Sequence, residues 1–480
     1  MSRTRSRPAR LFLGLLAVGL VAVACETPDD SFVTTATTTT PTTDPPLTTQ
    51  PSASTTAPTT TVAPVGEDGV LRIGSLLPET GSLAAFGPPL IGAVELAVID
   101  VNAAGGVLGQ PVELLAADSG SDADLATAAL APVLDGGADL VVGPAVSGVA
   151  RRVFDSILTR PAMSCLPSIT AADIGVGDSP LALRTAPSDD LQVVALAELA
   201  AGDEPASVAL LVAEDERGLR FASGLVAELT DREIPLAAEQ VYDAEADDLS
   251  GPVEAVADAA ADVVIVVGAL DSAPLLAQLV DAGVDAGSII VSDGLATPQL
   301  GERAAEDDPT VVAGVRGTVP TDIAPLAAEF FLPAFVEFAG NVDTFFAAQA
   351  YDCVAVVALA AVSVSSTDPV TLADAVVDVT VGGTPCDAIA DCVALLADGT
   401  DIDYVGASGI DLDEGGEATS AVYDVFVYGP DGTQEPLEQI GVGPAAAALE
   451  ASGTEDGADA ESDPTDDEGT DDEGTDDDAG

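Results

Sequence analysis

Two residue types that carry much of enzyme chemistry are absent from these 480 residues: the chain has no histidine and no lysine. Without histidine, Ser-His-Asp and Cys-His catalysis and imidazole-bound metal sites are excluded. Without lysine, Schiff-base chemistry and the lysine-containing phosphate loop of nucleotide hydrolases are excluded. A GxGxxG motif after a strand and a GxSxG nucleophile elbow are also missing. We therefore predict that the protein is not an enzyme, although the 81 acidic residues leave carboxylate-pair chemistry open without singling out a pair.

Positive charge is also scarce. The chain has 14 arginines against 81 acidic residues, which gives a formal net charge of -67. The excess is not confined to the C-terminal end, because only 15 of the acids lie from Glu450 onward. Such a surface repels phosphate and anionic lipid, so we exclude nucleic acid as a partner. It also suits a protein that stays soluble in high salt.

The N-terminal segment is typical of an export signal. A basic stretch, "MSRTRSRPAR", precedes the apolar run "LFLGLLAVGLVAVA", which has signal-peptide length and is short for a membrane span. The small residues of "AVAC" resemble the lipobox of bacterial lipoproteins, although Ala22 stands where leucine is usual. We interpret residues 1–24 as a lipoprotein signal peptide and Cys25 as the lipidated residue. An ordinary signal peptide with an incidental cysteine is the alternative.

Both ends of the chain beyond the signal have low-complexity sequence. Residues 25–66 are rich in threonine and proline and offer few apolar side chains to bury, so we predict a disordered tether between membrane and domain. Residues 446–480 repeat an acidic unit, and we predict a disordered tail whose role is plain solvation. Calcium binding by this tail lacks support because no EF-hand spacing is present.

Strand and helix patterns alternate between residues 67 and 445. The expected strands are residues 70–77, 111–118, 138–144, 161–168, 206–213, 234–242, 262–269 and 288–294. The expected helices are residues 88–106, 124–137, 147–158, 218–231, 251–261 and 272–284. Continuous Val/Ile/Leu strands are typical of parallel sheets covered on both faces, and ligands of such sheets bind beyond the carboxyl ends of the strands. We predict an α/β fold with two Rossmann-like lobes whose parallel sheets are flanked by helices.

Several segments, taken in order, resemble one known family. They are "LRIGSLLPETGSLAAFGPPLIGAVELAVIDVNAAGGVLGQPVELLAADSGSD", "VVGPAVSGVA", "LPSIT", "LRTAPSDD", "DVVIVVGALDSAPLLAQLVDAGV" and "QAYDCVAVVALAA". The ordered set, which covers nearly all of residues 70–437, resembles type I periplasmic binding proteins, and most of all the branched-chain amino-acid (Leu/Ile/Val) substrate-binding proteins of ABC importers. The resemblance implies two lobes joined by a hinge of crossing strands. Lobe 1 would hold about residues 67–184 and 319–365, and lobe 2 about residues 185–318 and 366–445.

The same resemblance implies a function. We expect an exported monomer, lipid-anchored to the outer face of the cell membrane, that captures an amino acid or a related small amide or carboxylate by lobe closure. It would deliver this ligand to an ABC transporter permease, and it would use no cofactor and no metal. The alternative is a cell-surface ligand-sensing receptor that uses the same clamp without transport.

The family's polar ligand contacts fall on four residues of this chain. Ser147 stands just before a predicted helix, where a hydroxyl and free N–H groups attract a ligand carboxylate; a simple N-cap is the alternative. Ser168 and Thr170 match a polar stretch after the next strand, with turn chemistry as the alternative. Asp293 matches an acid that takes the ligand ammonium, and a turn aspartate before Gly294 is the alternative.

Three further positions concern the walls of the site. Phe86 falls where the family often has an aromatic wall, and Tyr351 falls where an aromatic closes the site, with core packing as the alternative. Arg217, in "AEDERGLRF", occupies a position at which the family has a tyrosine that stacks on the ligand. If Arg217 faces the ligand, an anionic ligand becomes plausible. The alternative is a surface arginine paired with Glu214 or Asp215.

Lipidation of Cys25 would leave four cysteines for the folded domain. An even number of cysteines in an exported chain indicates disulfides, and four residues allow three connectivities. Cys386 and Cys392 are six positions apart, close enough for a small loop. The remaining pair would be Cys165 and Cys353, which both lie in the first lobe of the family fold. Metal binding by the four cysteines is the alternative.

Overall fold

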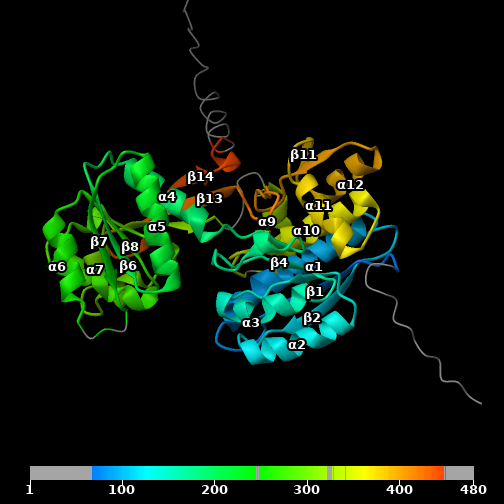
Figure 1. Cartoon of the computed structure of the whole chain (residues 1–480), viewed down its shortest axis with the longest axis horizontal. Coiled ribbons are helices and arrows are strands. Elements are labelled where there is room, and N and C mark those ends of the chain that lie inside the picture. Colours follow the sequence, from blue (N-terminus) through cyan, green and yellow to red (C-terminus); the bar gives the residue numbers. More distant parts are fainter. Residues whose placement is uncertain are drawn as a thin grey trace, which may run out of the picture. The chain divides into compact units, whose positions relative to one another are not determined.

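Two sheets with helices on both faces organise the computed structural model (Figure 1), which describes residues 68–447 and 449 apart from residues 245, 247, 322–326, 328 and 341. The predicted signal peptide and tether and nearly all of the predicted tail lie outside these residues. All eight expected strands and all six expected helices are present. The predicted α/β class with parallel sheets is therefore confirmed.

The first sheet has five parallel strands in the order β2-β1-β3-β4-β5. Its strands are β1 (Arg72–Leu77), β2 (Glu113–Asp118), β3 (Leu140–Val142), β4 (Met163–Leu166) and β5 (Ala182–Arg184). The crossover helices are α1 (Gly87–Ala103), α2 (Ala123–Asp135) and α3 (Ser147–Leu158). We call this sheet and the helices packed on it the first lobe. Because its strands are parallel, the loops that follow β1, β3 and β4 share one edge of the sheet.

The second sheet has seven strands in the order β14-β13-β10-β9-β8-β6-β7. Its strands are β6 (Val208–Ala213), β7 (Leu236–Tyr242), β8 (Val263–Val267), β9 (Ile289–Val291), β10 (Arg316–Pro320), β13 (Ala421–Tyr428) and β14 (Gln434–Val442). Only the last two strands run antiparallel to their neighbours. The helices are α4 (Asp189–Ala201), α5 (Glu216–Asp231), α6 (Ser250–Ala259), α7 (Pro274–Asp281) and α8 (Leu300–Ala304). This sheet and its helices form the second lobe.

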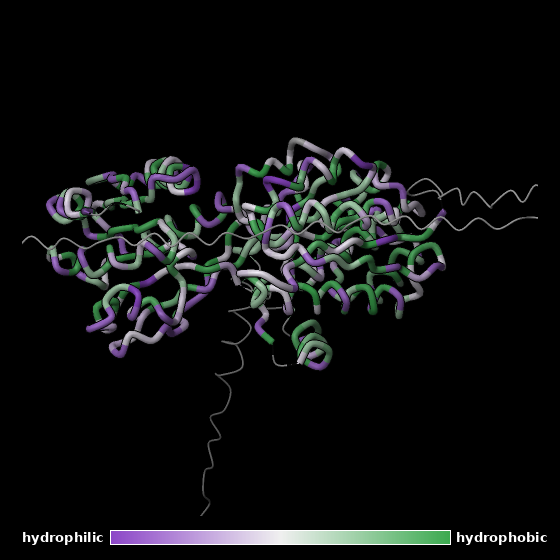
Figure 2. The backbone as a smooth tube through the Cα atoms, turned by 90° about the horizontal axis from the view of Figure 1, so that it is seen from below, coloured by the Kyte–Doolittle hydropathy of each residue, from purple (hydrophilic) through white to green (hydrophobic). Residues whose placement is uncertain are grey.

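The remaining helices extend the first lobe. They are α9 (Phe331–Ala339), α10 (Ala347–Val364), α11 (Pro369–Asp378) and α12 (Ile389–Ala397), with the short strands β11 (Thr384–Cys386) and β12 (Ile402–Tyr404). Among the described residues two helical stretches, 84–103 and 347–364, are long and apolar enough to cross a membrane by length and composition. The second is 83% buried in the fold, as expected of a core helix. Figure 2 colours the backbone by hydropathy and shows apolar (green) stretches throughout the folded part of the chain.

One lobe boundary differs from the expectation. From the sequence we expected the chain to enter the second lobe for the last time after residue 365. Residues 366–418 instead still pack in the core of the first lobe. The reason is that Leu372 of α11 and Ile389 of α12 are buried in the same cluster as α10. The chain passes between the lobes at residues 185–188, again after β10, and a third time at Ser420, directly before β13.

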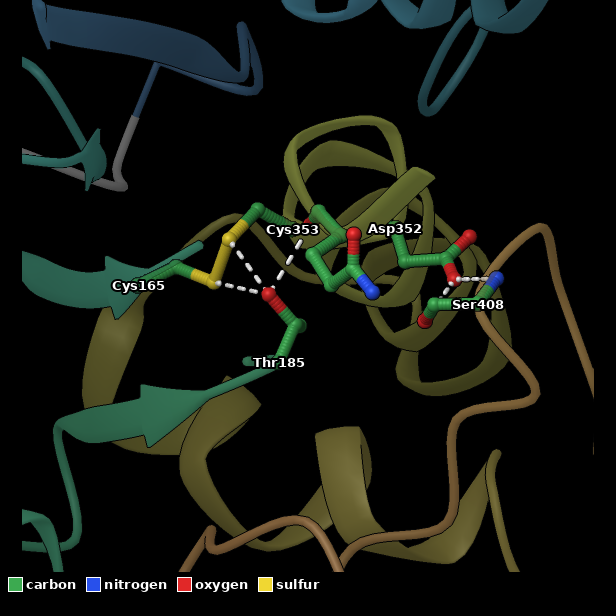
Figure 3. Close-up of a disulfide and its surroundings, with 6 residues drawn as sticks. Cys165, Thr185, Asp352, Cys353 and Ser408 are labelled. Carbon is green, nitrogen blue, oxygen red and sulfur yellow. Dashed lines mark hydrogen bonds between the residues drawn. A yellow bond between two sulfur atoms is a disulfide. The ribbon is translucent and has the colours of Figure 1, made fainter. Parts of the chain in front are cut away.

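The four cysteines of the domain lie in two close pairs. Cys165 of β4 and Cys353 of α10 have Cα atoms 5.7 Å apart, and Cys386 and Cys392 have Cα atoms 5.5 Å apart. The first pair is completely buried. Figure 3 shows Thr185 beside it. The Thr185 hydroxyl donates to the Gln349 carbonyl at 2.9 Å and lies 3.3 Å from the Cys353 sulfur.

Ion pairs engage most of the arginine side chains in the described part of the chain. Eight of the ten arginines beyond residue 66 are paired with a carboxylate: Arg72, Arg151, Arg160, Arg184, Arg217, Arg220, Arg232 and Arg316. Most of these pairs are solvent-exposed and contribute little stability each, about 0–1 kcal/mol. The pairs of Arg184 and Arg217 differ, because one of the partners in each is buried.

Candidate functional site

Ser147 lies at the carboxyl edge of the first sheet, in the first turn of α3. The helix begins at Ser147 itself, and Val146 is the N-cap residue, with no side-chain capping bond. The N-cap alternative for Ser147 is therefore wrong by one position. The side chain is half-buried, and the space around the next residue, Gly148, is open. The first N–H groups of an α-helix have no acceptor within the helix, so this end of α3 can receive an anion.

The loop between β4 and β5 carries Ser168 and Thr170 at the same edge. Ser168 donates its hydroxyl to the Ala145 carbonyl at 3.1 Å, which ties this loop to the turn that precedes α3. The Thr170 carbonyl accepts from the backbone N–H of Asp189 at 2.8 Å. The Ser168 bond joins two loops 23 positions apart in sequence, and the Thr170 carbonyl joins the first lobe to α4.

Arg217 lies between two aspartates that are distant in sequence. Its Nη2 atom is 3.0 Å from Asp189 Oδ1 and 2.6 Å from Asp293 Oδ1, and its guanidinium carbon lies 4.7 Å from the centre of the Phe221 ring. The expected alternative partners are wrong, since Asp215 caps α5 by accepting from the Gly218 N–H at 2.6 Å. We call Asp189, Arg217 and Asp293 the acidic clamp.

With two aspartates and one arginine, the acidic clamp has a formal charge of one negative unit. Burial raises the pKa of Asp189, and the neighbouring Arg217 opposes this shift. Burial also disfavours charge on Arg217, but Asp293 and Asp189 outweigh it and raise the pKa of the guanidinium. Arg217 is therefore charged and already shared by two carboxylates. It offers no free cation to a ligand, which removes the argument for an anionic ligand and favours one with a positive group.

The two aromatic candidates lie in different surroundings. Phe86 is 44% exposed on the loop after β1 and has its ring centre 5.6 Å from that of Phe345, so it can form part of a wall. Tyr351 is buried in α10, where its hydroxyl donates to Asp100 at 2.7 Å. Burial raises the pKa of this phenol, with the Asp100 charge adding to the effect. The structure thus agrees with core packing for Tyr351 rather than with a ligand contact.

Two polar residues of this region were not foreseen. Asp189 is only 3% exposed and links Thr170 to Arg217, and Arg184 is wholly buried beneath the loop that carries Thr170. Both lie in the stretch "LRTAPSDD", which contributed to the family resemblance without any of its residues being assigned a role. The described residues contain no group of three or more His, Cys, Asp or Glu side chains suited to a metal ion.

Comparisons with known proteins agree with this architecture. A family model described as "Periplasmic binding protein" matches residues 70–421. The Leu/Ile/Val-binding protein BraC3 of Rhizobium johnstonii is 34% identical over 122 residues, which are 25% of this chain and 33% of that protein. The chemotactic signal transduction system substrate-binding protein BasB of Halobacterium salinarum is 28% identical over 237 residues, 47% of this chain and 57% of that protein. The chain thus aligns with between a third and just over half of the length of these relatives.

Solved structures share the fold at low sequence identity. The leucine-binding protein LivK of Thermotoga maritima superimposes with a TM-score of 0.58 and 20% identity, over 78% of this chain and 99% of that one. The branched-chain amino acid transporter substrate-binding protein LivJ of Streptococcus pneumoniae, in complex with isoleucine, gives a TM-score of 0.57 and 19% identity, over 78% and 100% of the two chains.

Proposed function

Because this chain belongs to the periplasmic binding protein family, we propose that it is an extracytoplasmic solute receptor that captures an amino acid by lobe closure and delivers it to an ABC permease. The proposed ligand class, an amino acid, rests on the arrangement of charges in the candidate site. The first lobe offers hydroxyl and N–H groups at the start of α3, and the second lobe offers the acidic clamp with its net negative charge.

A zwitterionic ligand complements both groups. Its carboxylate would bind at Ser147 and the N-terminus of α3, where the helix dipole favours an anion. Its ammonium would bind at Asp293, whose carboxylate is partly exposed while that of Asp189 is buried. Phe86 would form part of the wall, whereas Arg217 would hold the two carboxylates in place instead of contacting an anionic ligand.

Removal of the Ser147 hydroxyl tests this proposal. Ser147→Ala should weaken binding of the tightest-binding L-amino acid about tenfold, because a hydrogen bond to a charged group contributes roughly 1.5–3 kcal/mol. Calorimetric titration of the parent with each of the twenty L-amino acids identifies that ligand. Ser156→Ala, at an exposed position of the same helix, is the matched control and should bind like the parent. Equal affinity of the parent and Ser147→Ala would place the carboxylate elsewhere.

A second candidate function is ligand sensing without transport. It is favoured by the similarity to the Halobacterium protein, whose name places it in a chemotactic signal transduction system. The strongly acidic composition, with 81 acidic residues against 14 arginines, also suits a salt-rich medium. A permease and an ATPase encoded beside this chain would support transport, and a chemotaxis transducer in that place would support sensing.

We also propose that the protein is anchored through Cys25, which lies outside the described residues. Two acyl chains anchor a protein stably, whereas one chain binds only weakly. In a bacterial host, Cys25→Ser should move the protein from the membrane fraction to the soluble fraction, as immunoblotting of the two fractions would show. Retention of the variant in the membrane at the parent's level would exclude a lipid anchor at this residue.

The cysteine pairs complete the proposal for an exported chain. Oxidising compartments allow disulfides to form and persist. The distances between Cys165 and Cys353 and between Cys386 and Cys392 are those of disulfides, so we propose that both pairs are oxidised after export. We further propose that the chain acts as a monomer, with residues 25–66 as its tether.

A further inference from the structure

Arg184 is completely buried at the end of β5, yet it contacts neither the acidic clamp nor Ser147 directly. Its guanidinium instead faces the loop of residues 168–174, the segment that carries Ser168 and Thr170. Nη1 donates to the carbonyls of Ile169 at 3.1 Å and Ala171 at 2.8 Å. Nη2 donates to the carbonyl of Ile174 at 2.5 Å.

Glu417 forms an ion pair with this arginine. Glu417 Oε2 lies 3.0 Å from Arg184 Nε, without the alignment of a hydrogen bond, and the Arg184 backbone N–H donates to the Gly416 carbonyl at 2.8 Å. Glu417 stands three residues before Ser420, where the chain makes its third passage between the lobes. Arg184 therefore contacts both the loop of residues 168–174 and the segment that leads into the hinge.

The loop has few other attachments of this kind. The Thr170 carbonyl is taken by the Asp189 N–H, and Arg151 binds Asp173 from the outer side with two contacts of 2.8 Å. The guanidinium is suited to the inner position because it presents five donors in one rigid plane, whereas a lysine ammonium is a compact point charge. Without Arg184 the Ile169 carbonyl would lose its donor, and the carbonyls of Ala171 and Ile174 would keep only the backbone N–H groups of Ile174 and Val176.

We propose that Arg184 is a positioning residue for ligand binding: its buried guanidinium fixes the loop of residues 168–174, and Glu417 links that loop to the third passage of the hinge. This inference rests on the proposed function, which assigns the loop of Thr170 to the ligand site. Arg184 itself touches no ligand. It sets where the Thr170 side chain lies and couples the loop to the segment that moves when the lobes close.

Two conservative variants test the proposal by local hydrogen exchange and by affinity. Arg184→Lys keeps the charge but loses the planar fork, and Glu417→Gln keeps the shape but leaves the guanidinium without its counter-charge. In both, amides of residues 168–176 should exchange at least tenfold faster than in the parent, while amides of β8 keep their protection. Affinity for the tightest-binding of the twenty L-amino acids should fall about tenfold.

The matched control is Arg160→Gln, which removes an exposed ion pair with Asp135 in the same lobe and should change neither readout. Unchanged exchange of the loop in both variants would overturn the proposal. Faster exchange with unaltered affinity would overturn it as well, because the loop would then be ordered by Arg184 without serving the ligand. If the parent binds none of the amino acids, the proposed function fails, and the exchange rates alone decide whether Arg184 fixes the loop.

Discussion

Asp293→Asn should weaken the binding of an amino acid by about 10- to 150-fold, which corresponds to roughly 1.5–3 kcal/mol for a hydrogen bond to a charged group. Asp293 is the more exposed carboxylate of the acidic clamp, with 21% of its side chain accessible against 4% for Asp189. The change makes the clamp neutral, since Arg217 then balances Asp189 alone. The ligand ammonium would lose its charged partner, and calorimetric titration would measure the loss.

The effect should depend on the ammonium group of the ligand. The carboxylic acid that lacks the amine should bind the parent weakly and should lose little further affinity in Asp293→Asn. Asp190→Asn is the matched control, because Asp190 is an exposed neighbour of Asp189 whose partner is Arg220 rather than Arg217. If Asp293→Asn and the parent bind the amino acid equally, the ammonium is held by another group.

Asp352→Ala should lower the free energy of unfolding by about 4 kcal/mol or more. Asp352 is completely buried in α10 and accepts four hydrogen bonds, two of them drawn in Figure 3. Its Oδ1 accepts from the Tyr404 hydroxyl at 2.7 Å and the Ala407 N–H at 3.0 Å. Its Oδ2 accepts from the Ser408 N–H at 2.7 Å and the Ser408 hydroxyl at 2.5 Å. Each buried donor left without an acceptor costs about 1–3 kcal/mol.

Denaturant unfolding of three variants would rank their losses in the free energy of unfolding. Asp352→Asn keeps the shape but turns one acceptor oxygen into an NH₂ group that faces two donors, so it should lie between Asp352→Ala and the parent. Asp374→Asn, at an exposed position of the neighbouring α11, should lie within about 0.5 kcal/mol of the parent. A loss below about 1 kcal/mol for Asp352→Ala would show that these donors find other acceptors.

The local elements could be read from the sequence because their signals are local. The apolar strands and the apolar spacing of α1 are properties of neighbouring residues, and Asp122 marks the start of α2 by accepting from the Leu125 N–H. The boundary after residue 365 was misplaced because it depends on a distant contact. Leu372 and Ile389 could cover either lobe by their pattern, and only the packing against α10 decides which.

For the candidate site, too, the sequence pointed to individual residues but not to contacts between distant ones. Family resemblance pointed to Ser147, Thr170 and Asp293, and the structure places them at the carboxyl edges of the two sheets. The partners of Arg217 could not be read from the sequence, because an acidic chain offers a carboxylate at almost any separation. Neighbours in sequence were expected, whereas the actual partners are 28 and 76 positions away. Parallel strands bring such distant loops to one edge, so position within the sheet, rather than sequence distance, determines which charges meet.

The scarcity of arginine, and its engagement in ion pairs, also limits where proteases can cleave the folded chain. An enzyme of trypsin specificity cleaves after lysine or arginine, and this chain has no lysine and only ten arginines beyond residue 66. Most of those side chains already hold a carboxylate and would have to leave it to enter a protease pocket. No arginine follows Arg316, so the last 164 residues contain no such cleavage site. We therefore expect an enzyme of this specificity to cleave the folded chain slowly.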